Sequence, residues 1–183
     1  MRPPPPSFIT VIRACDRFSD WTGRAIAWAV VPLFAGLTYE VIARYGFNAP
    51  TEWAFDVTFM LYGAHFMLGS AYTLRKGAHI RTDMLYEKWS TRTKGVIDSV
   101  GYLVFFFPAM VFLLWAGWDA FFVSYQMGER SDISPWRPII YPFKGVIPLT
   151  AVLLMIQGVS ELLKSLYAAT TGATYEERET ILV

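Results

Sequence analysis

Long stretches of this chain carry no charged side chain, and the charged residues gather in short blocks between them. The run at residues 57–74 contains 18 residues without Lys, Arg, Asp or Glu. A helix of that length, rising about 1.5 Å per residue, approaches the ~30 Å thickness of a bilayer's hydrocarbon core. The pattern therefore predicts a membrane-spanning helix over about residues 52–74.

Three more apolar runs predict three more spans. Residues 25–39 and 99–118 are uncharged, and a further apolar run begins after Lys144. With their flanks, these runs predict spans of about 22–41, 97–118 and 144–160. The expected fold class is an all-α integral membrane protein with four transmembrane helices plus short interfacial amphipathic helices.

The segments outside the spans predict an arm and a tail. Residues 1–6 are rich in proline, and 7–20 place Phe8, Ile12 and Cys15 at helical spacing, which suits either an interfacial amphipathic helix or a lead-in to the first span. We expect an N-terminal arm at 1–20, a four-span domain at 21–165 and a polar tail at 166–183.

The connections carry their own signals. In the turn at 46–52, Asn48 and Pro50 break the helix and Thr51 is placed to cap the next one. Asp83 is placed to cap either a second interfacial helix or an extension of the third span. Residues 119–144 form the longest connection, with room for a surface-lying or re-entrant helix.

The basic residues predict an orientation. Residues 1–24, the 75–94 loop and residues 161–183 hold twelve Lys and Arg, whereas the other connections hold four. Because basic residues favour the cytoplasmic side, both termini are expected there.

Composition supports a membrane protein and limits the chemistry. The chain is 54% hydrophobic and 17% charged, with a net charge of +1 and one cysteine, Cys15. A soluble domain has about 25% charged residues. No basic tract indicates a nucleic-acid partner, and no nucleophile–base pair or metal set indicates an enzyme.

Polar residues at the ends of the spans are the candidates for structural or interface roles. Glu40 pairs with Arg44 at helical spacing, and Glu52 with Trp53 would fix the outer hairpin. Further candidates are His79, Arg81 and Asp83 at the inner turn. All of these would also serve as interfacial anchors without any partner.

His65 lies near the middle of the second span, where an ionisable side chain is either functional or a neutral imidazole bonded to a neighbouring helix. His65 and His79 are 14 residues apart, or about 21 Å along a helix, so they cannot ligate one haem iron within a monomer. No cofactor is expected in this chain.

Several motifs together resemble a known family. They are Glu40-Val-Ile-Ala-Arg44-Tyr-Gly-Phe-Asn48-Ala-Pro50, then Trp53, then Gly69 to Tyr72, then His79-Ile-Arg81-Thr-Asp83. Over roughly residues 20–165, the chain resembles the small permease subunit, or DctQ-like subunit, of tripartite ATP-independent periplasmic (TRAP) transporters. Asp56 stands where some relatives have a glutamate soon after the tryptophan.

The resemblance implies a bacterial inner-membrane subunit that braces a large multi-span permease, which holds the sodium and substrate sites. A periplasmic binding protein delivers a solute, commonly a carboxylate, to such a complex. The resemblance makes five residues candidates for docking that protein: Asn48, Glu52, Glu129, Arg130 and Arg137. It leaves the transported substrate open.

Two other functions fit four spans without catalytic residues. One is the membrane anchor of a redox complex, which a haem absorbance band would reveal. The other is a self-assembling channel or adaptor, which conductance by this chain alone would reveal.

Overall fold

The structure is a computed structural model that describes residues 6–77 and 89–175. Its elements are α1 (Pro6–Ala27), α2 (Val30–Val41), the π-helical turn η1 (Ile42–Gly46), α3 (Ala54–Arg75), α5 (Thr91–Gly101), the π-helical turn η2 (Tyr102–Phe106), α6 (Phe107–Met127), α7 (Tyr141–Lys144) and α8 (Val146–Thr171). The candidates His79, Arg81 and Asp83, and the proline-rich tip at 1–5, lie outside the described residues.

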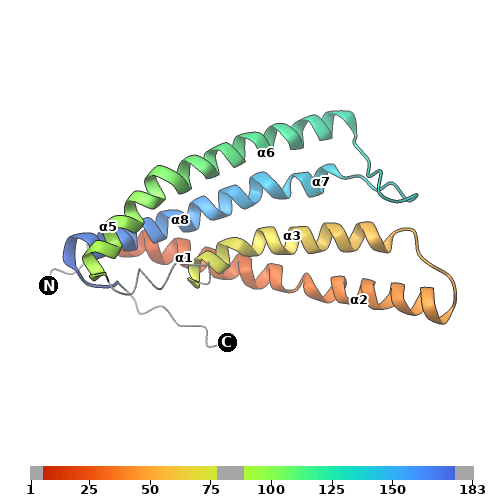
Figure 1. The fold of residues 1–183 in the computed structure, drawn as a ribbon, viewed down its shortest axis with the longest axis horizontal. Helices are drawn as coiled ribbons and strands as arrows, with labels where there is room; N and C mark the ends of the chain where they lie inside the picture. The colour runs from red at the N-terminus through yellow and green to blue at the C-terminus, as the bar shows by residue number, and fades with distance from the viewer. Residues whose placement is uncertain (1–5, 78–88, 176–183) are drawn as a thin grey trace.

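The helices lie side by side in a row. Figure 1 shows α6, α8, α3 and α2 in that order, with α1 packed against α3 and α8 at one end. We call this the terminal end, since α1 begins and α8 finishes there. The opposite end, with the loops 47–53 and 128–140, is called the loop end. α8 is the central helix, because it packs against α1, α3, α5 and α6.

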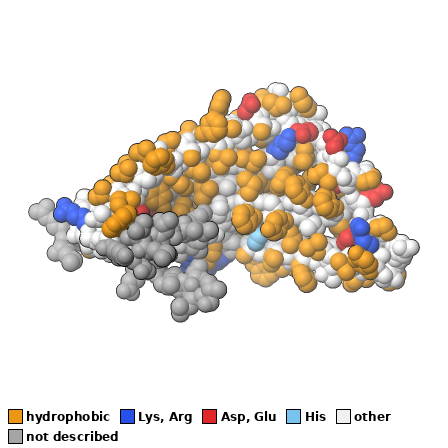
Figure 2. Space-filling view, in the orientation of Figure 1, with side chains coloured by type: hydrophobic (Ala, Val, Ile, Leu, Met, Phe, Trp, Pro, Cys, Tyr) orange, Lys and Arg blue, Asp and Glu red, His pale blue; other side chains and the backbone are white. Residues whose placement is uncertain are grey.

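Within residues 6–77 and 89–175, three helical stretches are long and apolar enough to cross a membrane. They are Ser7–Gly46, Thr91–Met127 and Tyr141–Thr171. Figure 2 shows hydrophobic side chains spread over the middle of the layer, with charged ones gathered at the loop end. α3, which matches the predicted span at 52–74, is not among the three, so a fourth crossing stays a prediction.

A break between α1 and α2 follows from Pro32. Proline has no N–H to give to the carbonyl four residues earlier, that of Trp28. The N–H of Val31 donates to this oxygen instead, at 3.1 Å, and residues 28–29 leave the regular helix. Proline is a common cause of such interruptions in a long helix.

The helices extend further than the apolar runs predicted. Residues 7–20 form no separate helix but the first part of α1, which is the lead-in alternative. Asp119 was expected to begin the longest connection, but α6 continues past it to Met127. The connection therefore covers only residues 128–140, and these residues contain no helix. α8 likewise continues to Thr171, into the predicted tail. Charged residues lie within these helices because the helices are longer than a bilayer's hydrocarbon core.

The prediction that Thr51 caps the second span is wrong. α3 begins after Trp53, which makes no capping bond. Both the backbone N–H and the hydroxyl of Thr51 donate to the Glu40 carboxylate instead. The Thr51 hydroxyl, whose oxygen would have accepted from an N–H in the first turn of α3, therefore bonds to the end of α2 instead.

Glycines let α8 approach its neighbours closely. A Cβ on Gly95 in α5 would lie 2.4 Å from the Ala169 backbone nitrogen and 2.6 Å from the Ser165 carbonyl oxygen. A Cβ on Gly158 in α8 would lie 2.5 Å from the Phe106 ring. Such small-residue contacts are typical of helix packing in membranes.

We expect Gly95→Ala to destabilise the α5–α8 contact, because the added methyl meets backbone that cannot move aside. The expected loss is about 2 kcal/mol of unfolding free energy, measured by denaturant titration in detergent. Gly101→Ala is the matched control, since its Cβ meets nothing within 4 Å and alanine favours helix. Equal stability of the two variants would contradict the described packing.

Candidate functional site

The turn between α2 and α3 is held by one carboxylate. Glu40 accepts from the Arg44 guanidinium at 2.7 Å (Nε) and 2.5 Å (Nη2), and from Thr51 across the turn. Tyr39 and Trp53 stack beside it, with ring centroids 5.8 Å apart. The predicted Glu40–Arg44 pair is confirmed, and we call Glu40, Arg44 and Thr51 the hairpin joint.

Asn48 shapes the same turn, whereas Glu52 does not hold it. Asn48 has a φ of 52°, the left-handed conformation that asparagine tolerates better than most residues. Its side chain and that of Glu52 are exposed. The expected role of Glu52 in fixing the hairpin with Trp53 has no described contact to support it. The described contacts of this turn are made by Tyr39, Glu40 and their partners.

A second joint ties the 128–140 loop to the start of α3. The Asp56 side chain is completely buried, at 0% exposure, and accepts from the hydroxyls of Ser131, at 2.8 Å, and Ser134. Asp56 lies in the first turn of α3, where the helix dipole also favours a negative charge. This loop joint brings residues 75 or more positions apart to one point.

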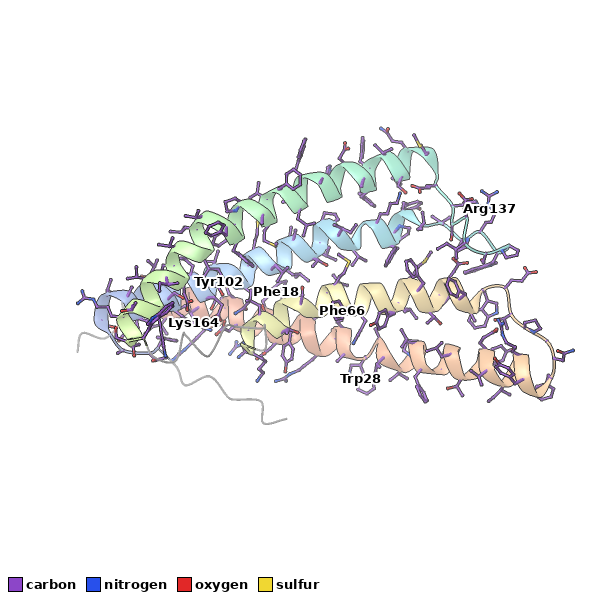
Figure 3. The ribbon with its side chains drawn as sticks, in the orientation of Figure 1. Phe18, Trp28, Phe66, Tyr102, Arg137 and Lys164 are labelled. Carbon is purple, nitrogen blue, oxygen red and sulfur yellow. The ribbon has the colours of Figure 1, made fainter. Side chains whose placement is uncertain are left out.

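The docking candidates on the 128–140 loop lie together. Glu129 pairs with Lys144 of α7 at 2.5 Å, and Arg130 donates to the carbonyl oxygen of Arg137 at 3.2 Å. Arg137 in turn pairs with Asp132 at 2.7 Å, and Figure 3 shows Arg137 in the loop at the loop end. Asn48 and Glu52 lie on the other loop of the same end.

The pKa of Glu129 is lowered, chiefly because its carboxylate accepts a hydrogen bond from the Lys144 ammonium group. A carboxyl with a lowered pKa stabilises the loop above its ordinary pKa of 4.5, and that stabilisation is lost as pH falls through the lower folded value.

We therefore expect amides of residues 129–140 to lose protection from hydrogen exchange below about pH 4.5, after correction for the intrinsic rate. Glu129→Gln should show the weaker protection already at neutral pH. Glu52→Gln, an exposed acid at the same end, serves as the control. Protection that is identical in Glu129→Gln and the parent would show that the Lys144 pair does not hold the loop.

The terminal end holds a cluster of buried charged and polar groups. Asp16 of α1, only 7% exposed, accepts from three residues of α8: Gln157 at 3.1 Å, Ser160 at 2.6 Å and Lys164 at 2.8 Å. Figure 3 shows Lys164 among the helices at this end. Because these donors lie on successive turns, one face of α8 surrounds the carboxylate.

Two more acids and a second cation complete this cluster. Glu161, 1% exposed, accepts from Lys164 at 3.2 Å and from Gln157 at 3.3 Å. Arg75, at the end of α3, pairs with Asp20 and lies 4.0 Å from Asp16. We call Asp16, Asp20, Arg75, Gln157, Ser160, Glu161 and Lys164 the ionic cluster. It joins α1, α3 and α8.

The ionic cluster and the loop joint were not among the predicted sites. In residues 7–20, Asp16 and Ser19 are buried together with Ile12, although both side chains are polar. A usable signal was present, since Gln157, Ser160, Glu161 and Lys164 recur at spacings of three and four on one helix face.

His65 bonds to a neighbouring helix. Its Nδ1 lies 3.0 Å from the carbonyl oxygen of Ile26, two residues before the break at residues 28–29. The ring therefore supplies a hydrogen bond close to the point where the helix is interrupted. This contact agrees with the packing alternative, and it joins α3 to α1.

None of these sites has the composition of a metal centre or an active site. Within residues 6–77 and 89–175 there is no group of three or more His, Cys, Asp or Glu that could hold a metal ion. What the joints and the ionic cluster do is fix helices and loops to one another. Their arrangement suits a rigid membrane component.

A family model described as the DctQ component of tripartite ATP-independent periplasmic transporters matches residues 33–167. The match includes the hairpin joint, the loop joint and most of α8. Neither a curated protein nor a solved structure matches the chain.

Proposed function

The chain belongs to the DctQ component family of TRAP transporters, and we propose on this basis that it is the scaffold subunit of a sodium-coupled transporter for organic acids or related solutes. In this proposal it braces the large permease subunit, which holds the sodium and substrate sites. The family is a transporter component and not an enzyme class, and it gives the redox-anchor hypothesis no support.

The observation that carries the proposal is the family match over residues 33–167. The structure adds two supporting features. Buried polar contacts fix the helices at both ends, at the ionic cluster and at the loop joint. Large apolar side chains such as Trp28 and Phe66, 75% and 73% exposed, cover the outside of the layer. A fixed layer with apolar surfaces suits a static partner for a moving subunit.

We further propose four spans in a bacterial inner membrane, with α3 as the fourth and both termini cytoplasmic. The excess of basic residues on that side supports this orientation. The loop end then faces the periplasm, and the binding protein docks on Asn48, Glu52, Glu129, Arg130 and Arg137. The docking proposal is supported by the position of these five residues on two loops at the same end. The loop joint ties the 128–140 loop to the start of α3, which directly follows the 47–53 loop.

The test is sodium-dependent solute uptake in the native host after deletion of this chain. Restoring the parent chain should restore uptake, and Arg130→Ala with Arg137→Ala should lower it while the large permease still co-purifies. Normal uptake without this chain would contradict the scaffold role. Normal uptake in the double variant would contradict only the docking surface.

A further inference from the structure

α3 carries an aromatic stripe that stays largely exposed along one face of the helix. Its exposed large side chains are Phe55, Phe59, Tyr62 and Phe66, which are 62%, 43%, 61% and 73% exposed. Their spacings of four, three and four place them on one face of the helix. Figure 3 shows Phe66 about midway along α3.

The neighbours of α3 occupy its other faces. Tyr72 contacts Gly23 of α1, and His65 bonds to Ile26. On the opposite flank, Gly63 lies against Phe143, next to α8, and Ala71 and Leu74 are buried. The stripe lies between these two flanks. Phe59 touches the second flank, with its ring centroid 5.4 Å from that of Phe143 in α7, and all four stripe residues remain at least 43% exposed.

The stripe continues as a heptad seam. Gly69 and Thr73 follow Phe66 at spacings of three and four, so six positions, 55, 59, 62, 66, 69 and 73, repeat as the a and d positions of a coiled coil. A Cβ added to Gly69 would meet nothing within 4 Å, so the seam has open space between Phe66 and Thr73. A repeat of this period matches a second helix that crosses at a small angle.

Tyr62 shows that lipid is a poor match for this surface. At about 1.5 Å per residue it lies about 4 Å from the midpoint of α3. Its hydroxyl has no hydrogen-bond partner among the described residues, although other polar side chains of α3, Ser70 and Thr73, bond to their own backbone. An unpaired hydroxyl in hydrocarbon is costly, and lipid-facing tyrosines concentrate at the membrane interfaces instead.

We propose that a transmembrane helix of the large permease subunit packs along this stripe and hydrogen-bonds to the Tyr62 hydroxyl. The inference rests on the proposed function, which supplies the partner. It adds the face of contact and the chemistry of the facing helix: small residues opposite the aromatic rings and one polar side chain opposite Tyr62. A second copy of this chain fits less well, because bulky rings would then oppose bulky rings.

Site-specific photo-crosslinking in native host membranes tests the contact. Phe59 and Phe66 would each be replaced by p-benzoylphenylalanine in the tagged full-length chain. The controls are Phe34 of α2 and Phe112 of α6, which are 70% and 64% exposed but lie on the outer helices. We expect adducts with the large permease from positions 59 and 66, in clear excess over both controls.

Other results separate the two proposals. If the permease co-purifies but positions 59 and 66 give no excess of its adducts, or give adducts of this chain with itself, the stripe is not the contact and the scaffold role stands. If the permease neither co-purifies nor crosslinks from any position, the proposed function fails, and the inference fails with it.

Tyr62→Phe provides a second readout, since it removes only the hydroxyl. The isolated chain should unfold at an unchanged temperature. The dissociation constant of the complex should rise about threefold, which corresponds to the usual contribution of one hydrogen bond between membrane helices. Tyr45→Phe, at an 82% exposed position outside the stripe, is the control. An unchanged complex, or a lowered unfolding temperature of the chain alone, would overturn the assigned role of the hydroxyl.

Discussion

Asp16→Asn should be among the most destabilising single substitutions in this chain. The carboxylate accepts from Gln157, Ser160 and Lys164 in a site that is almost closed to solvent. Loss of its charge leaves Lys164 with less compensation for its own burial. Breaking one side of a buried ion pair costs about 3–5 kcal/mol. We expect the free energy of unfolding to fall by about 3 kcal/mol, because asparagine keeps one acceptor.

Unfolding of the purified chain by denaturant in detergent measures this effect. Asp119→Asn is the matched control, since Asp119 is an exposed acid on α6 and its replacement should change stability by less than about 0.5 kcal/mol. Asp16→Asn combined with Lys164→Met should lose less than the sum of the two single variants, because the pair is then removed together. Additive losses would show that Asp16 and Lys164 do not stabilise each other.

Asp56→Asn should release the 128–140 loop from α3. The side chain is fully buried and accepts from two serine hydroxyls, so its replacement by asparagine removes the charge and one of the two acceptors. We expect a loss of about 2–3 kcal/mol in unfolding free energy. Faster cleavage by trypsin after Arg130 should accompany it.

The loop supplies its own control for this experiment. Asp132 is 83% exposed, and its pair with Arg137 is a surface one, so Asp132→Asn should change stability by less than about 1 kcal/mol. Ser131→Ala should reproduce part of the Asp56 effect, and the double variant should add little to Asp56→Asn. A loop that stays protected in Asp56→Asn would contradict the loop joint.

Local patterns in the sequence were sufficient for the helices and for one joint. Uncharged runs located the apolar part of every long helix, because burial in a bilayer requires a continuous apolar surface. The Glu40–Arg44 pair was predictable because both residues lie on one helix, four positions apart.

The remaining contacts depend on residues far apart in the chain. Asp16 meets Lys164 148 positions later, and Asp56 meets Ser131 75 positions later. No local periodicity encodes such a pairing, and the usual rule that charges lie outside the core does not anticipate a buried Asp16. Helix ends were also misplaced, since Asp119 and Glu161 lie within helices that extend past the apolar run.

Affinity purification of the tagged chain from its native host, with identification of the proteins that accompany it, tests the central claim most directly. The account predicts recovery of a large multi-span permease, with a periplasmic binding protein in some preparations. Recovery of a redox enzyme, or of this chain alone, would contradict the assignment as a transporter scaffold.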